Sequence, residues 1–118
     1  MKWLAIALVC VLGQSMLGRA EAADAAAVER GQRVYELWCA DCHAPTGERY
    51  GLPAGFNVLQ KRYKGSLPAD LSERTDLSTL TIRTIVRNGR NVMPRTRKTE
   101  ISDAELEDLI AYVRRNNP

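Results

Sequence analysis

The stretch CADCH, residues 39–43, places Cys39 and Cys42 three positions apart with His43 directly after them. Two thiols at this spacing on a helical turn can form thioethers with the two vinyl groups of one porphyrin, and the adjacent histidine can bind its iron. With three cysteines and one histidine in 118 residues, chance produces this spacing on the order of one time in a thousand. The stretch therefore predicts one covalently attached haem c, held by Cys39, Cys42 and His43, with His43 as an axial metal ligand.

Other interpretations of the two cysteines each lack a required feature. A thioredoxin-like dithiol is expected within a βαβ pattern, and no alternating strand pattern surrounds this one. A structural zinc site needs about four ligands, but after residue 22 the sequence has no cysteine or histidine outside this stretch. A disulfide between Cys39 and Cys42 would leave His43 without a role.

Met93 is expected to be the second axial ligand. It is the only methionine after residue 22, and it lies 50 residues beyond His43, between Gly89 and Pro94. A thioether suits haem iron, stabilises the ferrous state and raises the reduction potential. The alternative is a methionine that fills the core, which the flanking Asn91 and Pro94 disfavour. Cofactor binding is thus assigned to Cys39, Cys42, His43 and Met93, and no catalytic residue is assigned.

Residues 1–22 are typical of a secretory signal peptide. Lys2 precedes the apolar run of residues 3–12, and small residues lead to an expected cleavage after Ala22, with Ala20 as the alternative. The run is too short for an ordinary membrane-spanning helix, although an uncleaved anchor remains the alternative. Cys10 lies within this run and is interpreted as part of it. The sequence predicts a signal peptide, residues 1–22, followed by one periplasmic domain, residues 23–118.

The remaining pattern predicts an all-α fold. Apolar residues recur at helical spacing in residues 24–38, between a cap at Ser78 and a stop at Gly89, and after the capping box of Ser102 and Glu105. Glycines and prolines interrupt residues 44–76, where only a short helical turn is expected, at residues 61–64. Such a long loop suits a chain that wraps a cofactor.

Residues 28–118 resemble the small bacterial class I c-type cytochromes, through Gly31 and Tyr35 before the CADCH stretch, a Met-Pro pair and a final helix. The resemblance implies the class I cytochrome c fold, with three to four helices around one covalently bound haem. It implies that the first and last helices cross at Gly31, with Tyr35 packed against the last-helix residues Leu109, Tyr112 and Val113. It also implies that the backbone carbonyl of Pro53 accepts a hydrogen bond from His43.

The stretch of residues 82–94, IRTIVRNGRNVMP, further resembles cytochrome subunits of 4-cresol dehydrogenase-type flavocytochromes. This resemblance implies a periplasmic one-electron carrier that accepts electrons from a flavin-dependent dehydrogenase and passes them to the respiratory chain. The alternatives are a peroxidase-like haem enzyme and a haem-based ligand sensor, both with a displaceable sixth ligand. An enzyme is disfavoured, because the single histidine is used by the haem and no distal imidazole remains.

Charge is distributed unevenly along the second half of the chain. Residues 77–99 hold six basic side chains and no acid, whereas residues 100–108 hold five acids and no base. A basic surface around Met93 is expected to dock on an acidic face of a redox partner, with membrane contact only through a respiratory acceptor. No nucleic-acid or small-molecule partner is expected. The candidates for pairing with haem propionates are Arg62, Lys64 and Arg90.

Overall fold

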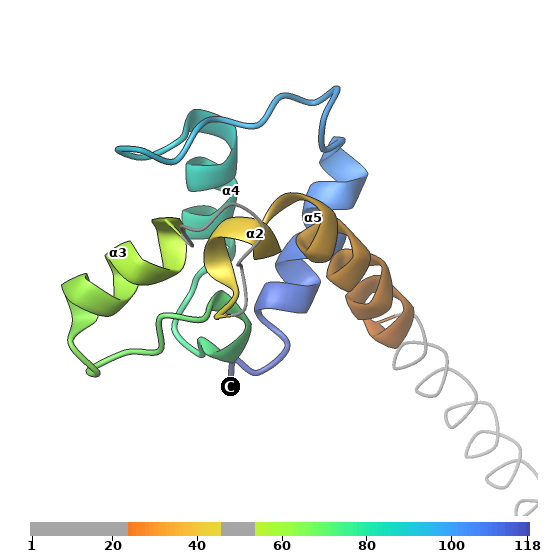
Figure 1. Cartoon of the computed structure of the whole chain (residues 1–118). Coiled ribbons are helices and arrows are strands. Elements are labelled where there is room, and N and C mark those ends of the chain that lie inside the picture. The colour runs from red at the N-terminus through yellow and green to blue at the C-terminus, as the bar shows by residue number, and fades with distance from the viewer. Residues whose placement is uncertain (1–23, 46–53) are drawn as a thin grey trace, which may run out of the picture.

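The computed structural model describes residues 24–45 and 54–118. Residues 24–38 are helical, and the further helices are α2 (Ala40–His43), α3 (Ala54–Tyr63), the 3₁₀ helix η2 (Leu71–Glu73), α4 (Thr79–Asn88) and α5 (Asp103–Val113) (Figure 1). Within these described ranges there is no strand, only an isolated bridge between Arg90 and Met93. The all-α prediction is confirmed. The expected signal peptide and Cys10 lie outside the described residues.

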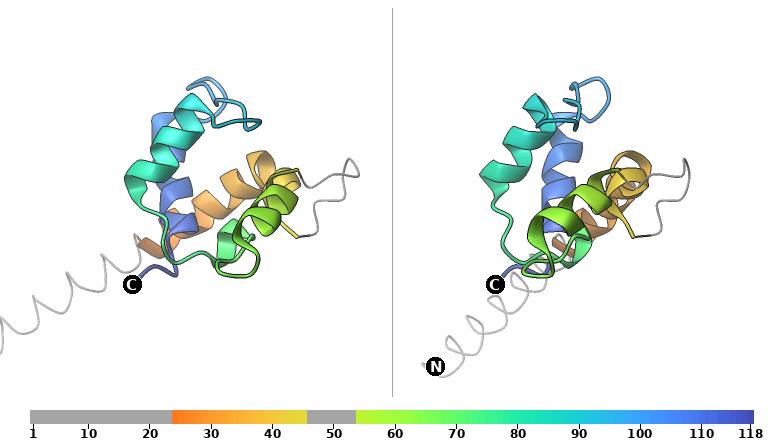
Figure 2. Two further views of the ribbon diagram at one scale, coloured as in Figure 1. Left: turned by 90° about the vertical axis from the view of Figure 1, so that its left-hand side faces the viewer. Right: turned by 60° about the vertical axis from the view of Figure 1, so that its left-hand side comes forward.

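The helix of residues 24–38 crosses α5 at Gly31, as the resemblance implied (Figure 2). A Cβ atom added to Gly31 would lie only 1.8 Å from the backbone oxygen of Asp108, so no other residue fits at this crossing. One turn later, the rings of Tyr35 and Tyr112 lie with centroids 5.3 Å apart. The close backbone approach thus brings the two helices into direct side-chain contact.

Local capping signals set the bounds of α4 and α5. The Ser78 side chain accepts a hydrogen bond from the Thr81 backbone N–H, and Gly89 ends α4 with a φ of 73°. Ser102 and Glu105 form the complete capping box at the start of α5. These caps satisfy backbone groups that a helix end leaves without partners, so α4 begins and ends, and α5 begins, where the sequence predicts.

The expectation of an almost continuous loop over residues 44–76 is wrong. Residues 54–63 form the ten-residue helix α3, which packs against α2. Pro53 immediately precedes this helix, a position that does not interrupt it, and Lys61 and Arg62 lie favourably in its last turn. A proline just before a helix, or a glycine in its first turn, does not interrupt that helix, so the glycines and prolines of this region do not exclude α3.

The core lies mainly between α4 and α5 and the helix of residues 24–38. Its most deeply buried side chains are Ile101, Leu106 and Leu109, and Ile82 and Val86 join it from α4. Across residues 24–45 and 54–118, no helix has the length and apolar character to cross a bilayer. A core this small leaves much of the apolar interior to be completed by a bound group.

Candidate functional site

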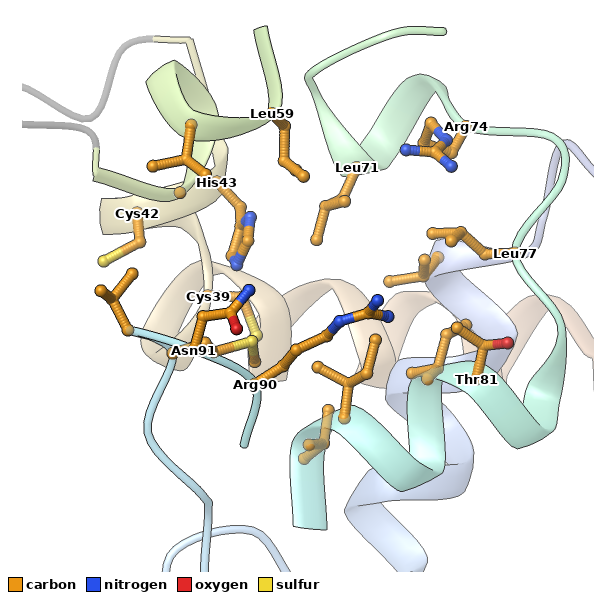
Figure 3. Close-up of a pocket in the computed structure, with 18 of the residues that line it drawn as sticks. Cys39, Cys42, His43, Leu59, Leu71, Arg74, Leu77, Thr81, Arg90 and Asn91 are labelled. Atoms are coloured by element: carbon orange, nitrogen blue, oxygen red, sulfur yellow. The ribbon is translucent and has the colours of Figure 1, made fainter. Parts of the chain in front are cut away.

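A cavity of about 270 Å³ lies between the helices (Figure 3). Its walls come from the CADCH segment, α3, η2, α4, the loop after α4, and α5. Most of the lining is apolar, including Leu59, Leu71, Leu77, Ile82, Ile85 and Val86. Such a lining suits a large apolar group with a few polar attachment points.

The predicted thiols and imidazole all reach this cavity. Cys39 begins α2, and the backbone N–H groups of Cys42 and His43 donate hydrogen bonds to its carbonyl at 3.1 and 2.9 Å. This single turn directs the three side chains to one side, and Figure 3 shows the imidazole pointing into the cavity. Both thiols are free rather than joined in a disulfide, and burial raises the pKa of the Cys39 thiol to about 12.

His43 is enclosed by the backbone of α3. A Cβ atom added to Gly55 would lie 2.8 Å from Cε1 and 2.9 Å from Nδ1 of the imidazole. Nδ1 is buried and has no hydrogen-bond partner among the described residues, and Pro53, its expected acceptor, lies outside them. Burial lowers the pKa of His43, against an opposing effect of Asp70. This shift favours the neutral ring, the form that binds a metal.

Met93 lines the same cavity from a tight turn that follows α4. Arg90 and Met93 exchange two backbone hydrogen bonds of 3.0 Å each, and Asn91 within the turn has a φ of 54°. Asparagine tolerates this left-handed conformation. Gly89 is required beside the turn, because a Cβ there would lie 2.6 Å from the carbonyl oxygen of Met93.

The structure therefore brings all four predicted cofactor-binding residues to one cavity, from segments about fifty residues apart in sequence. Within the part of the chain that the structure describes, no three His, Cys, Asp or Glu side chains cluster as a metal site. Two thiols, a neutral imidazole and a thioether around an apolar space fit a covalently held haem.

Among the described residues, three arginines line the cavity: Arg62, Arg74 and Arg90. Arg62 and Arg90 were predicted as partners of haem propionates, whereas Lys64, the third candidate, does not contribute to the lining. Figure 3 shows the Arg90 side chain extending across the cavity.

Arg74 is the functional candidate that sequence reasoning missed. Its side chain is 3% exposed, binds the Asp76 carboxylate through two hydrogen bonds of 2.5 and 2.6 Å, and lies 4.8 Å from the ring centroid of Tyr63. The hydrogen bond to Asp76 raises the pKa of Arg74 further. A charged group this buried needs such partners, and it gives the cavity wall a fixed positive charge. In the sequence, the only indication of this ion pair is that Arg74 and Asp76 lie two residues apart.

Three aromatic residues near the site differ in their surroundings. Tyr63 lines the cavity, whereas Trp38 is 48% exposed and is not part of the lining. The Tyr35 hydroxyl, in contrast, is buried at the cavity with no partner among the described residues, and burial raises its pKa.

The expected basic surface around Met93 is largely neutralised by neighbouring acids. Four of its six basic residues form ion pairs: Arg83 with Glu107, Arg87 and Lys98 with Asp103, and Arg97 with Glu100. Arg90 and Arg95 form no ion pair with any residue in the ranges 24–45 and 54–118. The acidic run that follows in sequence thus folds back on the basic one, which sequence position alone did not reveal.

Comparison with known proteins gives matches over most of the chain. The family model for subunit III of cbb3-type cytochrome c oxidase matches residues 26–113. Cytochrome c6 of Cyanidioschyzon merolae is 31% identical over 90 residues, which cover 75% of this chain and 74% of the relative. Cytochrome c6 of Cyanidium caldarium is 30% identical over 87 residues, 73% of this chain and 68% of the relative. No solved structure gives a significant match.

Proposed function

The chain belongs to the cytochrome c family as a haem c electron-transfer protein, and from that premise we propose a one-electron carrier with His43 and Met93 as axial ligands. Cys39 and Cys42 form the two thioethers. Each thiol adds across one vinyl group, its sulfur to one carbon and its hydrogen to the other, so attachment needs no oxidant. The bound haem supplies a single iron that changes its charge by one electron.

The observation that carries this proposal is the convergence of two distant segments on one cavity. The CADCH turn offers His43 as a neutral ligand, and the turn of residues 90–93 offers Met93. A carrier needs both axial positions filled, because an iron with no open position changes oxidation state without binding substrate. A peroxidase-like enzyme or a ligand sensor needs a displaceable sixth ligand and, for the enzyme, distal acid–base groups.

Arg74 and Arg90 are proposed to hold the haem carboxylates. Both line the cavity, and a guanidinium carries five N–H donors, so Arg74 can serve a haem carboxylate while its Nε and Nη2 donate to Asp76. Arg74 is already fixed by Asp76 and Tyr63, so its charge stays in place whether or not solvent reaches the cavity. Arg62 is a third cation within reach of this wall.

The ligand assignment is tested with Met93→Ala. This variant should lose the weak far-red sulfur-to-iron absorption band of the ferric protein, have a lower reduction potential, and bind cyanide readily. Val92→Ala is the matched control, because Val92 lies in the same turn and is 79% exposed. An unchanged spectrum and potential in Met93→Ala would refute the assignment and point to a lysine such as Lys64 or Lys98.

The proposed organisation is a signal peptide, residues 1–22, and a periplasmic cytochrome domain, residues 23–118. Support comes from the charge and apolar pattern before Ala22. The mass of the protein isolated from a periplasmic extract should equal residues 23–118 plus one haem. A mass that includes residues 1–22 would instead indicate an uncleaved anchor.

The proposed electron donor is a flavin-dependent dehydrogenase of the 4-cresol dehydrogenase type, with a respiratory protein as acceptor. Support for the donor is the resemblance of residues 82–94. Arg95 lies two residues after Met93 and forms no ion pair with any described residue, so it can guide an acidic partner, an attraction that salt screens beyond about 8 Å at physiological ionic strength.

Docking is tested by measuring the rate of cytochrome reduction by the purified dehydrogenase as salt is raised. Arg95→Glu should slow reduction at low salt more than Arg97→Glu does, because Glu100 already offsets the charge of Arg97. A rate that ignores salt and both substitutions would place the interface away from Met93.

A further inference from the structure

The segment that carries Met93 leaves α4 at Gly89 and returns to the core only at Ile101, which is 1% exposed. One backbone hydrogen bond ties its middle to α4, from the Thr96 N–H to the Val86 carbonyl at 2.8 Å. We call residues 89–101 the methionine segment. Its position therefore depends on a small number of polar contacts with the helices on either side.

Arg87 makes three of these contacts at once. Its Nη1 donates hydrogen bonds to the carbonyl oxygens of Ile101 at 2.9 Å and Thr96 at 3.3 Å. Its Nη2 donates to the Asp103 carboxylate in the first turn of α5 at 2.9 Å. The Arg87 side chain is only 17% exposed, so its bonds to the two carbonyls are partly shielded from water, whereas its bond to Asp103 is exposed. One guanidinium thus joins α4, the methionine segment and α5.

We propose that Arg87 is a positioning residue: its hydrogen bonds hold the methionine segment against α4 and α5 and so keep Met93 in place on the iron. This inference rests on the proposed axial role of Met93. Displacement of the ligand requires the segment to move, and movement requires Arg87 to give up its carbonyl partners in a shielded site. A lysine keeps the charge but lacks the planar fork that serves three acceptors together.

Arg83 provides a matched control one helical turn earlier on α4. It also pairs with an acid of α5, Glu107, but both side chains are more than 40% exposed, and among the described residues neither forms a hydrogen bond or ion pair with the methionine segment. Ile110 provides a second control, because it is buried in α5 but does not line the cavity. Ile110→Val weakens the core without removing any hydrogen bond of Arg87.

The test uses the haem-loaded ferric protein and measures the rate of cyanide binding, the far-red absorption band and the free energy of unfolding in denaturant. Cyanide can bind only after the sixth ligand has left, so its rate reports how often the segment opens. Arg87→Ala should speed cyanide binding about tenfold or more, which corresponds to about 1.4 kcal/mol, because the segment loses hydrogen bonds that hold it closed. Arg87→Lys should fall between Arg87→Ala and wild type.

Arg83→Ala and Ile110→Val should leave the cyanide rate within about twofold of wild type, whatever they do to the free energy of unfolding. If Ile110→Val speeds cyanide binding as much as Arg87→Ala at an equal loss of stability, opening is global and the positioning role is wrong. If wild type shows the far-red band and Arg87→Ala binds cyanide at the wild-type rate, only the role of Arg87 is overturned. If wild type itself lacks the band and binds cyanide as fast as Met93→Ala, both the ligand assignment and this inference fail.

Discussion

The two sides of the cavity are built from different interactions. On the His43 side, one continuous chain segment carries the thiols and the imidazole, and Gly31 fixes its helix against α5 by backbone contact. On the Met93 side, a segment without helix or strand is held by hydrogen bonds and ion pairs, chiefly those of Arg87 and Lys98 with Asp103. Backbone packing should make the first side, where Arg30 and Asp108 also form an ion pair across the crossing, less sensitive to pH and salt than the second side, which polar contacts hold.

The largest effect is expected from breaking the His43 side at its covalent bonds. Cys39→Ser or Cys42→Ser should leave little coloured, folded protein, because the small core lacks its largest apolar element without a fully attached porphyrin. The measurement is the haem retained by protein after acid–acetone extraction of a periplasmic fraction. Cys10→Ser is the matched control and should leave yield and colour unchanged. Full haem retention in a variant that carries both Cys39→Ser and Cys42→Ser would show that attachment does not depend on this stretch.

A substitution at the helix crossing should have the next largest effect. Gly31→Ala places a Cβ against the Asp108 carbonyl and should destabilise the protein by about 3 kcal/mol, at the upper end for overpacking. Gly65→Ala is the control: Gly65 has a φ of +86° but open space around it, so about 1–2 kcal/mol of backbone strain is expected. Denaturant unfolding measures both. Equal losses would mean that the helices can separate to admit a methyl group.

On the Met93 side, removal of the α5 cap tests a local polar contact. Ser102→Ala should cost about 1 kcal/mol of unfolding free energy, because the Glu105 N–H loses its acceptor and the capping box is broken. Thr84→Ala, an exposed substitution within α4, should change stability by less than about 0.5 kcal/mol. Indistinguishable values for the two variants would show that α5 is fixed by packing alone.

The smallest effect is expected from acid. The hydrogen bond from Lys98, with a further contribution from Arg87, lowers the pKa of Asp103 below its usual range. The stability from this carboxylate is therefore present above the pKa of the unfolded chain, about 3.9, and is lost as pH falls through the lower folded value. Wild type should exceed Asp103→Asn in unfolding midpoint from pH 5 to 7, and the difference should shrink below about pH 4. A difference that persists at pH 2 would assign the effect to packing instead.

Features encoded within a few residues were predictable. Both ends of α4 and the start of α5 followed from Ser78, Gly89 and the Ser102–Glu105 box, because an N-cap joins a side chain to a backbone group three residues away. The crossing at Gly31 was also foreseen, though through resemblance to a family rather than from the residues alone. Helix α3 was missed, since Pro53 and Gly55 carry the same local signal whether they break a helix or begin one.

The sequence by itself determined the chemistry of the site: the spacing of Cys39, Cys42 and His43, and Met93 as the single thioether beyond residue 22. Only the tertiary structure decided what surrounds these groups. Gly55 lies against the His43 ring, Arg74 is buried in the cavity wall, and Arg87 binds both the methionine segment and α5. Ligand identity is a property of one side chain and its spacing, whereas burial and charge pairing depend on segments that meet only after the chain has folded.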